Sequence, residues 1–513
     1  MGRLFFIFFL CLVSIQGHTN TSLQTLSLRS NKLGDRGTQV LGAALGRGDS
    51  SLKTINLDTN GMTSAGASSL ASAFGTSGLK GMSFGGNPIG PEGAMAFAQS
   101  MDGPLNFQGC GLTPESLAGL AALTPSLQAG GNNLGPDGAF KMAALMSANQ
   151  SPETIDLSNN DISDMGARSI AGSLATNTTT HTLNLAGNKI SLGGVSALFG
   201  SLGHNMTLTT LTLDDNEIGD AGASALAALL ERNTTLKTVS INNTKISMHG
   251  ALALSAALKI NRTLGSLSLT GNSIGPTGAS SLAVTDELNT VVTISYDGGP
   301  SAPFDPMKSF SGMDMGPEEM TGMMPQILSH RKMNLSKNRL GNQGASLLGG
   351  YMSQFQEMNM GNNQVGPGGA MSLIGGLMDN PTTTSIDLSG TTLDPAAMAM
   401  LGKVLATNQV LETLVLNNCE LGNAGVTALC QGLVMNQSLK NLSLESNNIS
   451  DAGALALAHA LKVNQTLQSL NLDNNKISPV GGGAFASLFT KVQIQSNAIR
   501  GPSQWTSAAA SLT

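Results

Sequence analysis

Cysteine is scarce in this sequence, which has four cysteines among 513 residues. Removal of an N-terminal leader would leave Cys110, Cys419 and Cys430, an odd and small number. Small secreted domains that rely on disulfides carry more cysteines, usually an even number. We therefore expect no disulfide framework.

Charged residues are also few, at 11% of the chain, and the net charge of −6 is spread along it. A nucleic-acid-binding surface needs a basic patch or stripe that neutralises phosphates. No such concentration of lysine and arginine occurs, so nucleic acid is not expected as a partner.

Long apolar runs are missing except at the N-terminus, where residues 4–15 are apolar, follow Arg3 and precede Gln16 and Gly17. This order is typical of a secretory signal that is cleaved after Gly17. The run is shorter than the roughly 20 residues of a membrane-spanning helix, and Gly, Asn and Ser interrupt every later apolar segment. The sequence thus predicts a signal peptide, no membrane span and a secreted or extracellular protein. The alternative is a misassigned gene start and a cytoplasmic protein.

Residues that carry catalysis are present but are not grouped. The six histidines are scattered, without a spacing that suits zinc. Glycine-rich segments such as Gly271–Gly275 lack the Gly-Lys-Ser/Thr ending of a phosphate loop. Cys419 and Cys430 occupy positions that suit the core better than a nucleophile. We therefore expect no enzyme, no cofactor and no metal site.

What the chain does have is a repeat, Leu-x-Leu-x-x-Asn-x-Leu. Its asparagine recurs every 28 residues from Asn132 to Asn272 and again from Asn363 to Asn475, which marks a repeat architecture. Eighteen such positions can be aligned, some with Thr, Cys or Asp in place of Asn: Asn31, Asn60, Asn87, Cys110, Asn132, Asn160, Asn188, Asn216, Thr244, Asn272, Asp297, Asn338, Asn363, Thr391, Cys419, Asn447, Asn475 and Asn497.

Each unit predicts a short strand, a turn and a helix. In one unit, Leu442 and Leu444 point to the interior, and residues 451–462 form a helix with the Ser450 hydroxyl as its N-cap. The asparagine after the strand can satisfy backbone groups of the turn, because it both donates and accepts. One unit cannot bury its own leucines, so the units must stack. We predict an α/β solenoid shaped like a horseshoe, with parallel strands on the concave face and helices on the convex face.

The longer pattern Leu-x-Leu-x-x-Asn-x-Ile-Gly/Ser-x-x-Gly-Ala, which covers essentially residues 23–500, resembles the ribonuclease-inhibitor-like leucine-rich-repeat (LRR) family. That family includes ribonuclease inhibitor, the GTPase activator for Ran, and the repeat regions of intracellular nucleotide-binding innate receptors. The resemblance implies protein recognition along the concave face and its rims. Extracellular LRR proteins commonly carry cysteine-rich caps, and the lack of such caps resembles the intracellular members.

One long interval, from Asp297 to Asn338, interrupts the array. It holds several prolines and glycines, which cannot continue a strand or a regular helix. We read residues 298–316 as a loop that bulges from a damaged repeat, and the methionines near it as gap fillers rather than as ligands of a soft metal. At the other end we expect a last strand at Val492–Ile494 and Trp505 as a lid on the last layer. The predicted organisation is a signal peptide (1–17), a first part of the array (23–297), a Pro/Gly/Met-rich irregular insert (298–325), a second part of the array (326–500) and a C-terminal tail (501–513).

Asparagine also occurs in twelve Asn-x-Ser/Thr sequons, which are potential glycan acceptors in a secreted chain. The candidates are Asn20, Asn177, Asn205, Asn233, Asn261, Asn436 and Asn464. All but Asn20 share one position between the helix and the next strand, where asparagine can take the left-handed conformation that ends a helix. The repeat therefore explains them without glycans as well.

The free face of the strands is predicted to be acidic. It carries one base, Arg29, and six acids: Asp58, Asp156, Asp214, Asp387, Glu445 and Asp473. An acidic wall would steer a basic protein, which weakly resembles how ribonuclease inhibitor meets its enzyme. A solvated polar face is the alternative, because binding hot spots favour Trp, Tyr and Arg, and only Arg29 is present. Glu445 and Asp473 alone are too few for a calcium site.

Three functions are therefore considered, in this order. The first is a non-enzymatic, secreted or surface-associated scaffold that binds a protein partner on its concave face, with a basic protein as one candidate. The second is an intracellular regulator of a small GTPase, as the Ran branch implies, although that branch usually has an acidic tail and this chain ends Ala-Ala-Ala-Ser-Leu-Thr. The third is the sensor region of an innate receptor without its upstream domain. The oligomeric state is not predicted.

Overall fold

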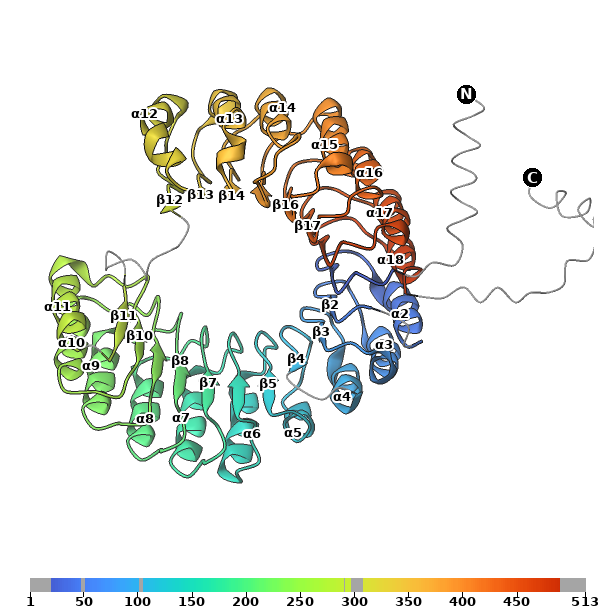
Figure 1. The fold of residues 1–513 in the computed structure, drawn as a ribbon. Coiled ribbons are helices and arrows are strands. Elements are labelled where there is room, and N and C mark those ends of the chain that lie inside the picture. The colour runs from blue at the N-terminus through green and yellow to red at the C-terminus, as the bar shows by residue number, and fades with distance from the viewer. Residues whose placement is uncertain (1–19, 48–50, 101–104, 290, 297–307, 490–513) are drawn as a thin grey trace, which may run out of the picture.

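A computed structural model of the chain describes residues 20–47, 51–100, 105–289, 291–296 and 308–489. These residues form a curved array in which short strands line the inner side and helices the outer side (Figure 1). The predicted α/β solenoid is therefore confirmed. The predicted signal peptide and C-terminal tail lie outside the described residues.

The strands are short because each unit contributes only one extended segment to the stack. Eighteen lie in the described residues, and each repeat is numbered here by its strand: β1 (Thr25–Ser27), β2 (Thr54–Asn56), β3 (Gly81–Ser83), β4 (Leu105–Asn106), β5 (Ser126–Gln128), β6 (Thr154–Asp156), β7 (Thr182–Asn184), β8 (Thr210–Thr212), β9 (Thr238–Ser240), β10 (Ser266–Ser268), β11 (Thr293–Ser295), β12 (Lys308–Ser309), β13 (Lys332–Asn334), β14 (Glu357–Asn359), β15 (Ser385–Asp387), β16 (Thr413–Val415), β17 (Asn441–Ser443) and β18 (Ser469–Asn471).

The helices follow the strands and pack against one another on the convex side. They are α2 (Gly34–Leu45), α3 (Ser64–Ser77), α4 (Gly90–Ser100), α5 (Ser116–Ala121), α6 (Gly135–Ser147), α7 (Ser163–Leu174), α8 (Leu192–Leu202), α9 (Gly219–Leu230), α10 (Met248–Leu258), α11 (Gly275–Leu288), α12 (Pro317–Leu328), α13 (Gly341–Gly349), α14 (Pro367–Gly375), α15 (Pro395–Thr407), α16 (Gly422–Leu433), α17 (Asp451–Val463) and α18 (Pro479–Ala486), with a 3-10 turn η1 (Met352–Gln354). As predicted for repeat 17, Leu442 and Leu444 of the strand segment and Leu457 and Leu461 of α17 are buried in one core.

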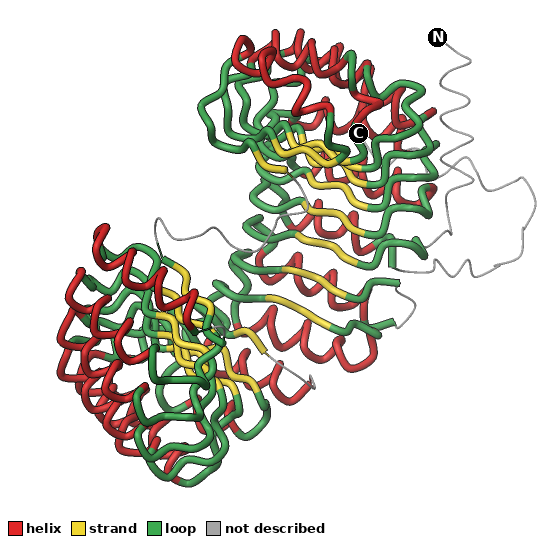
Figure 2. Tube along the Cα trace, turned by 60° about the vertical axis from the view of Figure 1, so that its left-hand side comes forward, coloured by secondary structure: helices red, strands yellow, loops and turns green. Residues whose placement is uncertain are grey.

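The order of the strands in the sheets does not follow the chain. One sheet runs from β12 to β18 and then continues directly into β1, β2 and β3, and the other runs from β4 to β11. The two ends of the described chain therefore meet inside a sheet, while β11 and β12 are edge strands (Figure 1). Figure 2 shows the strands of successive repeats side by side along the inner face, with the helices behind them.

We call the contact between repeat 18 and repeat 1 the terminal junction. Strands β18 and β1 are parallel there, with Leu470 opposite Leu26, and helices α18 and α2 pack together behind them. The predicted last strand, Val492–Ile494, and the predicted lid, Trp505, lie outside the described residues. The edge of β18 that a following strand would use is paired with β1.

The predicted irregular insert contains part of a regular repeat, which corrects the boundary at residues 298–325. Strand β12 pairs with β13, and α12 follows it, with Met320 and Met324 buried in the core. The repeat was missed because Met313 stands where the pattern has asparagine. The prediction that methionines fill gaps here is confirmed for Met315 as well, which is 4% exposed.

One aligned position needs a further correction. Leu267 of β10 pairs with Ile294 of β11, so Asn272, five residues after Leu267, corresponds to residue 299 rather than to Asp297. Asp297 and residue 299 both lie outside the described residues.

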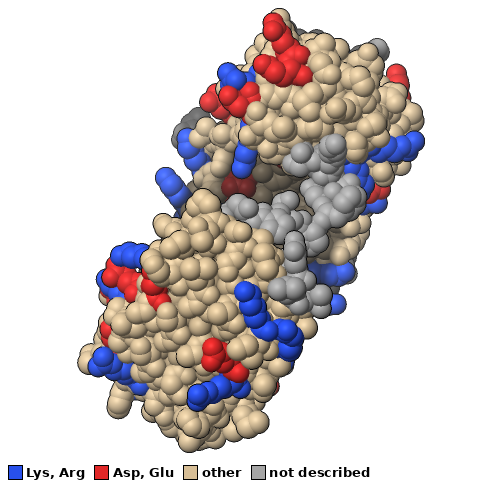
Figure 3. Space-filling view, turned by 90° about the vertical axis from the view of Figure 1, so that its left-hand side faces the viewer, with Lys and Arg blue, Asp and Glu red and all other residues tan. Residues whose placement is uncertain are grey.

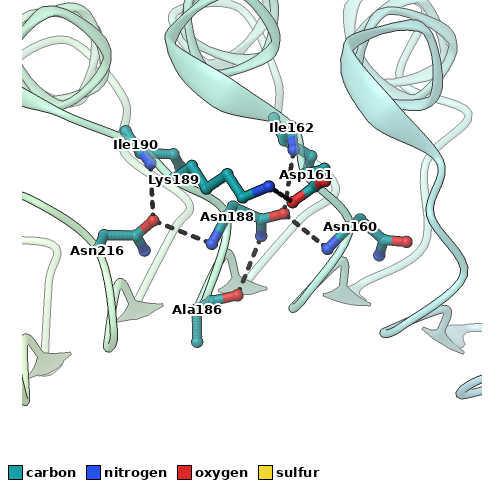
Figure 4. Close-up of polar contacts among 8 residues, drawn as sticks. All are labelled: Asn160, Asp161, Ile162, Ala186, Asn188, Lys189, Ile190 and Asn216. Carbon is teal, nitrogen blue, oxygen red and sulfur yellow. Dashed lines mark hydrogen bonds and ion pairs between the residues drawn. The ribbon is translucent and has the colours of Figure 1, made fainter.

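The asparagine of each repeat connects its neighbours, as predicted. The side-chain oxygen of Asn188 accepts from the amides of Asn160 (2.9 Å) and Ile162 (3.3 Å) (Figure 4). Its side-chain nitrogen donates to the carbonyl of Leu157 (2.9 Å). The same bonds recur from repeat to repeat, so we call this set the first asparagine ladder. It satisfies backbone groups that stacking removes from water.

The first ladder is interrupted where threonine replaces asparagine in repeat 15. Thr391 Oγ1 is buried and, within the described residues, has no hydrogen-bond partner. We expect Thr391→Asn to stabilise the chain by about 1 kcal/mol, because the longer amide can reach backbone groups of repeat 14. Urea unfolding would measure the change. Thr244→Asn is the matched control and should gain less, because Thr244 already donates to the carbonyl of Ile241 (2.7 Å). Equal gains would contradict this explanation.

Candidate partner-binding surface

The predicted acidic residues occupy two positions of the repeat on the concave face. Asp58, Asp214, Glu445 and Asp473, like Arg29, stand two residues before the ladder position, whereas Asp156 and Asp387 are the last residues of their strands. All six acids are partly exposed, and Arg29 is exposed. The prediction that these side chains lie on the free face of the strands agrees with this placement.

The terminal junction brings some of them together. Glu445, Asp473, Arg29 and Asp58 occupy one position in repeats 17, 18, 1 and 2, which are consecutive in the sheet. We call these four residues, together with Asp387 in repeat 15, the concave row. Asp156 and Asp214 are in repeats 6 and 8 of the other sheet and do not belong to it. Sequence reasoning missed the row because its members come from opposite ends of the chain.

A hollow of about 380 Å³ lies on the concave face at one end of this row. Asp387 and Glu445 line it, and Lys337 is its single basic side chain. The remaining lining residues are small or polar: Ser336, Asn359, Gly361, Asn362, Ser389, Asn417, Asn418 and Ser446. Such a lining is suited to polar and charged groups of a partner rather than to an apolar ligand.

Asp473 connects the concave row across the terminal junction. Its carboxylate accepts hydrogen bonds from the hydroxyl of Ser27 and from the amide of Arg29 (3.0 Å). Burial, with a smaller contribution from the negative charge of Glu445, raises the pKa of Asp473, and the bonds from repeat 1 oppose that change only in part. The ionised carboxylate is therefore held at some cost in the folded chain.

This raised pKa predicts a pH dependence. The contribution of Asp473 to stability is present below its unfolded pKa and is lost as the pH rises through the folded pKa. Asp473→Asn keeps an acceptor oxygen, as Asn417 has in repeat 16 (2.7 Å from Ser443 Oγ), and removes the charge. We expect the variant to gain stability relative to the unaltered chain between about pH 4 and pH 7. Urea unfolding at both pH values would measure this, and a constant difference would refute it.

The other acids also have structural bonds. Asp58 accepts from the hydroxyl of Ser83 (2.6 Å), and Asp214 accepts from the hydroxyl of Ser240 (2.6 Å). Asn417 makes the same kind of contact in its repeat. At this position an acid accepts the same hydroxyl hydrogen bond that asparagine accepts in repeat 16. A bound partner would contact the other carboxylate oxygen.

The seven predicted glycan acceptors form a second asparagine ladder. Their side-chain nitrogens donate to main-chain carbonyls of the preceding repeat, as Asn205 does to Leu174 (2.7 Å) and Asn261 to Leu230 (2.7 Å). Their exposed fractions lie between 1% and 7%. Asn20 takes part too, since it donates to Leu461 (2.6 Å) across the terminal junction. The expected left-handed conformation occurs at none of these seven residues, although it occurs at Asn149, the sequon asparagine 28 residues before Asn177.

Several helix N-termini are capped from the preceding repeat, which corrects the N-cap prediction for α17 in its detail. Ser450 is the N-cap of α17, but its hydroxyl accepts no amide of that helix. Instead, the Asn423 side chain accepts from the amides of Ser450 (2.9 Å) and Gly453 (3.0 Å). Asp35, Asp164, Asp220, Asn342 and Asp451 accept in the same way from the next repeat.

The cysteines of the described residues belong to the core, as predicted for Cys419 and Cys430. Cys110, Cys419 and Cys430 are free and buried. Burial raises the pKa of Cys110 and Cys430 to about 12 and that of Cys419 to about 11. The sulfur of Cys419 lies 3.3 Å from the carbonyl of Leu388, where a ladder asparagine would place its amide.

The described part of the chain has no group of three His, Cys, Asp or Glu residues that could hold a metal ion. None of its helices combines the length and apolar character that crossing a bilayer requires. On the side where β11 and β12 lie, charged side chains of both signs are scattered over a mostly neutral outer surface (Figure 3).

Comparison with known families identifies the class of this repeat. The Leucine Rich repeat family matches nine segments: residues 19–42, 83–98, 149–171, 176–199, 204–227, 261–283, 407–430, 436–458 and 463–486. Strand–helix units with parallel strands and these nine matches together support a leucine-rich-repeat protein. The finer assignment to the ribonuclease-inhibitor-like group stays a prediction.

Among solved structures, the chain is similar to "Leiomodin-1 Actin-Binding Site 2 (ABS2)". The identity is 22%, the match covers 29% of this chain and 88% of the other, and the TM-score is 0.27. Comparison with curated proteins gives no match.

Proposed function

We propose that this protein is a non-enzymatic scaffold that binds a basic segment of a protein partner along the concave row. The observation that carries the proposal is the placement of Glu445 and Asp473 in neighbouring repeats, with Asp58 two repeats beyond Asp473, in a row that has a polar hollow at one end. Repeat solenoids present extended concave surfaces of this kind to other proteins. Opposite charge would steer a basic partner to the row.

The dimensions of the row suggest the size of that segment. It extends over the six strands from β15 through β18 and β1 to β2. Neighbouring strands lie about 4.8 Å apart, so the row is about 24 Å long. An extended peptide of about seven residues has this length.

Binding can be tested with a lysine- and arginine-rich peptide that carries a fluorophore. The variant Asp58→Asn, Asp387→Asn, Glu445→Gln, Asp473→Asn is expected to bind it at least about tenfold more weakly, a loss of about 1.4 kcal/mol. The control Asp156→Asn, Asp214→Asn removes two acids of the same face in the other sheet. It should leave affinity nearly unchanged apart from general screening. Equal weakening by both variants, or no binding at low salt, would refute the proposed site.

The location of the chain is a proposal with two candidates. The leader-like N-terminus favours export, with the protein acting outside the cell or at its surface. The second asparagine ladder favours the cytoplasm, because glycans on buried amides would prevent the repeats from stacking. For a cytoplasmic protein, the family resemblance implies a regulator of the GTPase-activating or innate-receptor type.

Expression of the full chain in eukaryotic cells separates the two locations. A start near His18 in the medium, with a mass that falls on deglycosylation, would support export. An intact Met1 in the lysate, with no change in mass, would refute it.

A further inference from the structure

The terminal junction repeats the bonding of covalently consecutive repeats. The amide of Leu472 donates to the carbonyl of Ser27 (2.9 Å) as the amide of Leu444 donates to that of Asn471 (2.9 Å). The amide of Gln24 donates to the carbonyl of Gln468 (2.8 Å). Repeat 1 therefore lies where a nineteenth repeat would lie.

Both asparagine ladders also cross the junction. The side-chain oxygen of Asn31 accepts from the amide of Ile477 (2.9 Å), and its nitrogen donates to the carbonyl of Leu472 (3.1 Å). Asn20 donates to the carbonyls of Leu461 (2.6 Å) and Asn464 (2.8 Å). Side chains as well as backbone groups therefore form hydrogen bonds between repeat 18 and repeat 1, as they do between consecutive repeats.

The hydrophobic core is continuous through the same place. Leu26 and Leu28 of repeat 1 and Leu470 and Leu472 of repeat 18 are all fully buried. Terminal repeats of a solenoid usually need a polar cap, because their outer face is apolar. Here each terminal repeat covers the other, although Asn20 and its partner Leu461 are 441 positions apart in the chain.

The chain connects the two sheets between β3 and β4 and again between β11 and β12, and no strand pairing joins the sheets at either place in the described residues. We propose that the outer face of repeat 18 is a docking site for repeat 1, and that this docking holds the array together without the covalent connection between β11 and β12. The proposal does not depend on the function proposed above.

The test uses the full chain with a protease site inserted between residues 301 and 302. After complete cutting, size-exclusion chromatography with light scattering is expected to show one particle of the uncut mass that contains both fragments. Separation of the fragments of the unaltered chain would overturn the proposal.

A matched pair of variants tests whether the contact between repeat 18 and repeat 1 holds the cut fragments together. Asn20→Ala removes a ladder asparagine at the junction, and Asn205→Ala removes its equivalent between two covalently joined repeats. Cut Asn20→Ala should dissociate at a protein concentration at least about tenfold higher than cut Asn205→Ala. Circular dichroism of the uncut variants checks that both fold. Equal dissociation would overturn the assignment.

A disulfide provides an independent readout. Thr25 and Ser469 are opposite each other in β1 and β18, within the usual range for a disulfide between neighbouring strands. The cut double variant Thr25→Cys, Ser469→Cys should run as one band on a denaturing gel and as two after reduction. In the uncut double variant, a bridged band of twice the chain mass would show that repeat 1 of a second copy docks instead, which would overturn the intramolecular arrangement.

Discussion

Replacement of Asn188 by alanine is expected to lower the free energy of unfolding by about 3 kcal/mol, because it leaves several buried backbone groups without partners. Asn188 is fully buried in the first asparagine ladder. Its loss would remove the acceptor of the Asn160 and Ile162 amides and the donor to the carbonyl of Leu157. Water cannot replace these bonds inside the stack without separating the repeats.

The control variant, Lys189→Ala, changes the residue that follows Asn188. Lys189 forms an ion pair with Asp161 (2.7 Å), and the two side chains are 73% and 49% exposed (Figure 4). Exposed pairs of this kind contribute at most about 1 kcal/mol, so Lys189→Ala should change stability little. Urea unfolding followed by circular dichroism measures both variants. A loss for Asn188→Ala no larger than that for Lys189→Ala would show that the ladder is not a main source of stability.

The repeat explains why much of this fold could be predicted from the sequence. The alternation of Leu442 and Leu444 and the spacing of Leu457 and Leu461 report the local period, and neighbours in the chain are neighbours in the stack. That reasoning fails where distant segments meet. The pairing of β18 with β1 depends on the curvature summed over all repeats, which no single repeat encodes.

The candidate site shows the same limit. The sequence identified Glu445, Asp473, Arg29 and Asp58 as residues of the free face, since each follows a strand at the same position. It did not predict that Arg29 lies next to Asp473. The hydrogen bonds that the acids accept from neighbouring repeats were also missed. Predicting the bond from Ser83 to Asp58 requires knowledge of the register between two repeats. Asparagines at the same position elsewhere were the available signal.

A chain directed into the endoplasmic reticulum by an unrelated cleavable leader is expected to remain misfolded inside the cell. Glycans are attached to asparagine side-chain nitrogens while the chain is extended, and those nitrogens are donors in the second asparagine ladder. A glycan on Asn205 would remove its bond to the carbonyl of Leu174 and place a bulky group in a site that is 4% exposed. Stacking of repeats 7 and 8 would then be blocked.

Removing the seven buried sequons should restore folding and release into the medium. The changes are Ser22→Ala, Thr179→Ala, Thr207→Ala, Thr235→Ala, Thr263→Ala, Ser438→Ala and Thr466→Ala, which leave every ladder asparagine in place. The same variant made in the cytoplasm must fold, as checked by protease resistance. Ser443→Ala with Ser450→Ala, which removes the sequons of the exposed Asn441 and Asn448, should not restore release. If the unaltered chain leaves the cell folded and glycosylated at Asn205 or Asn261, the second ladder tolerates modification and export becomes the favoured location.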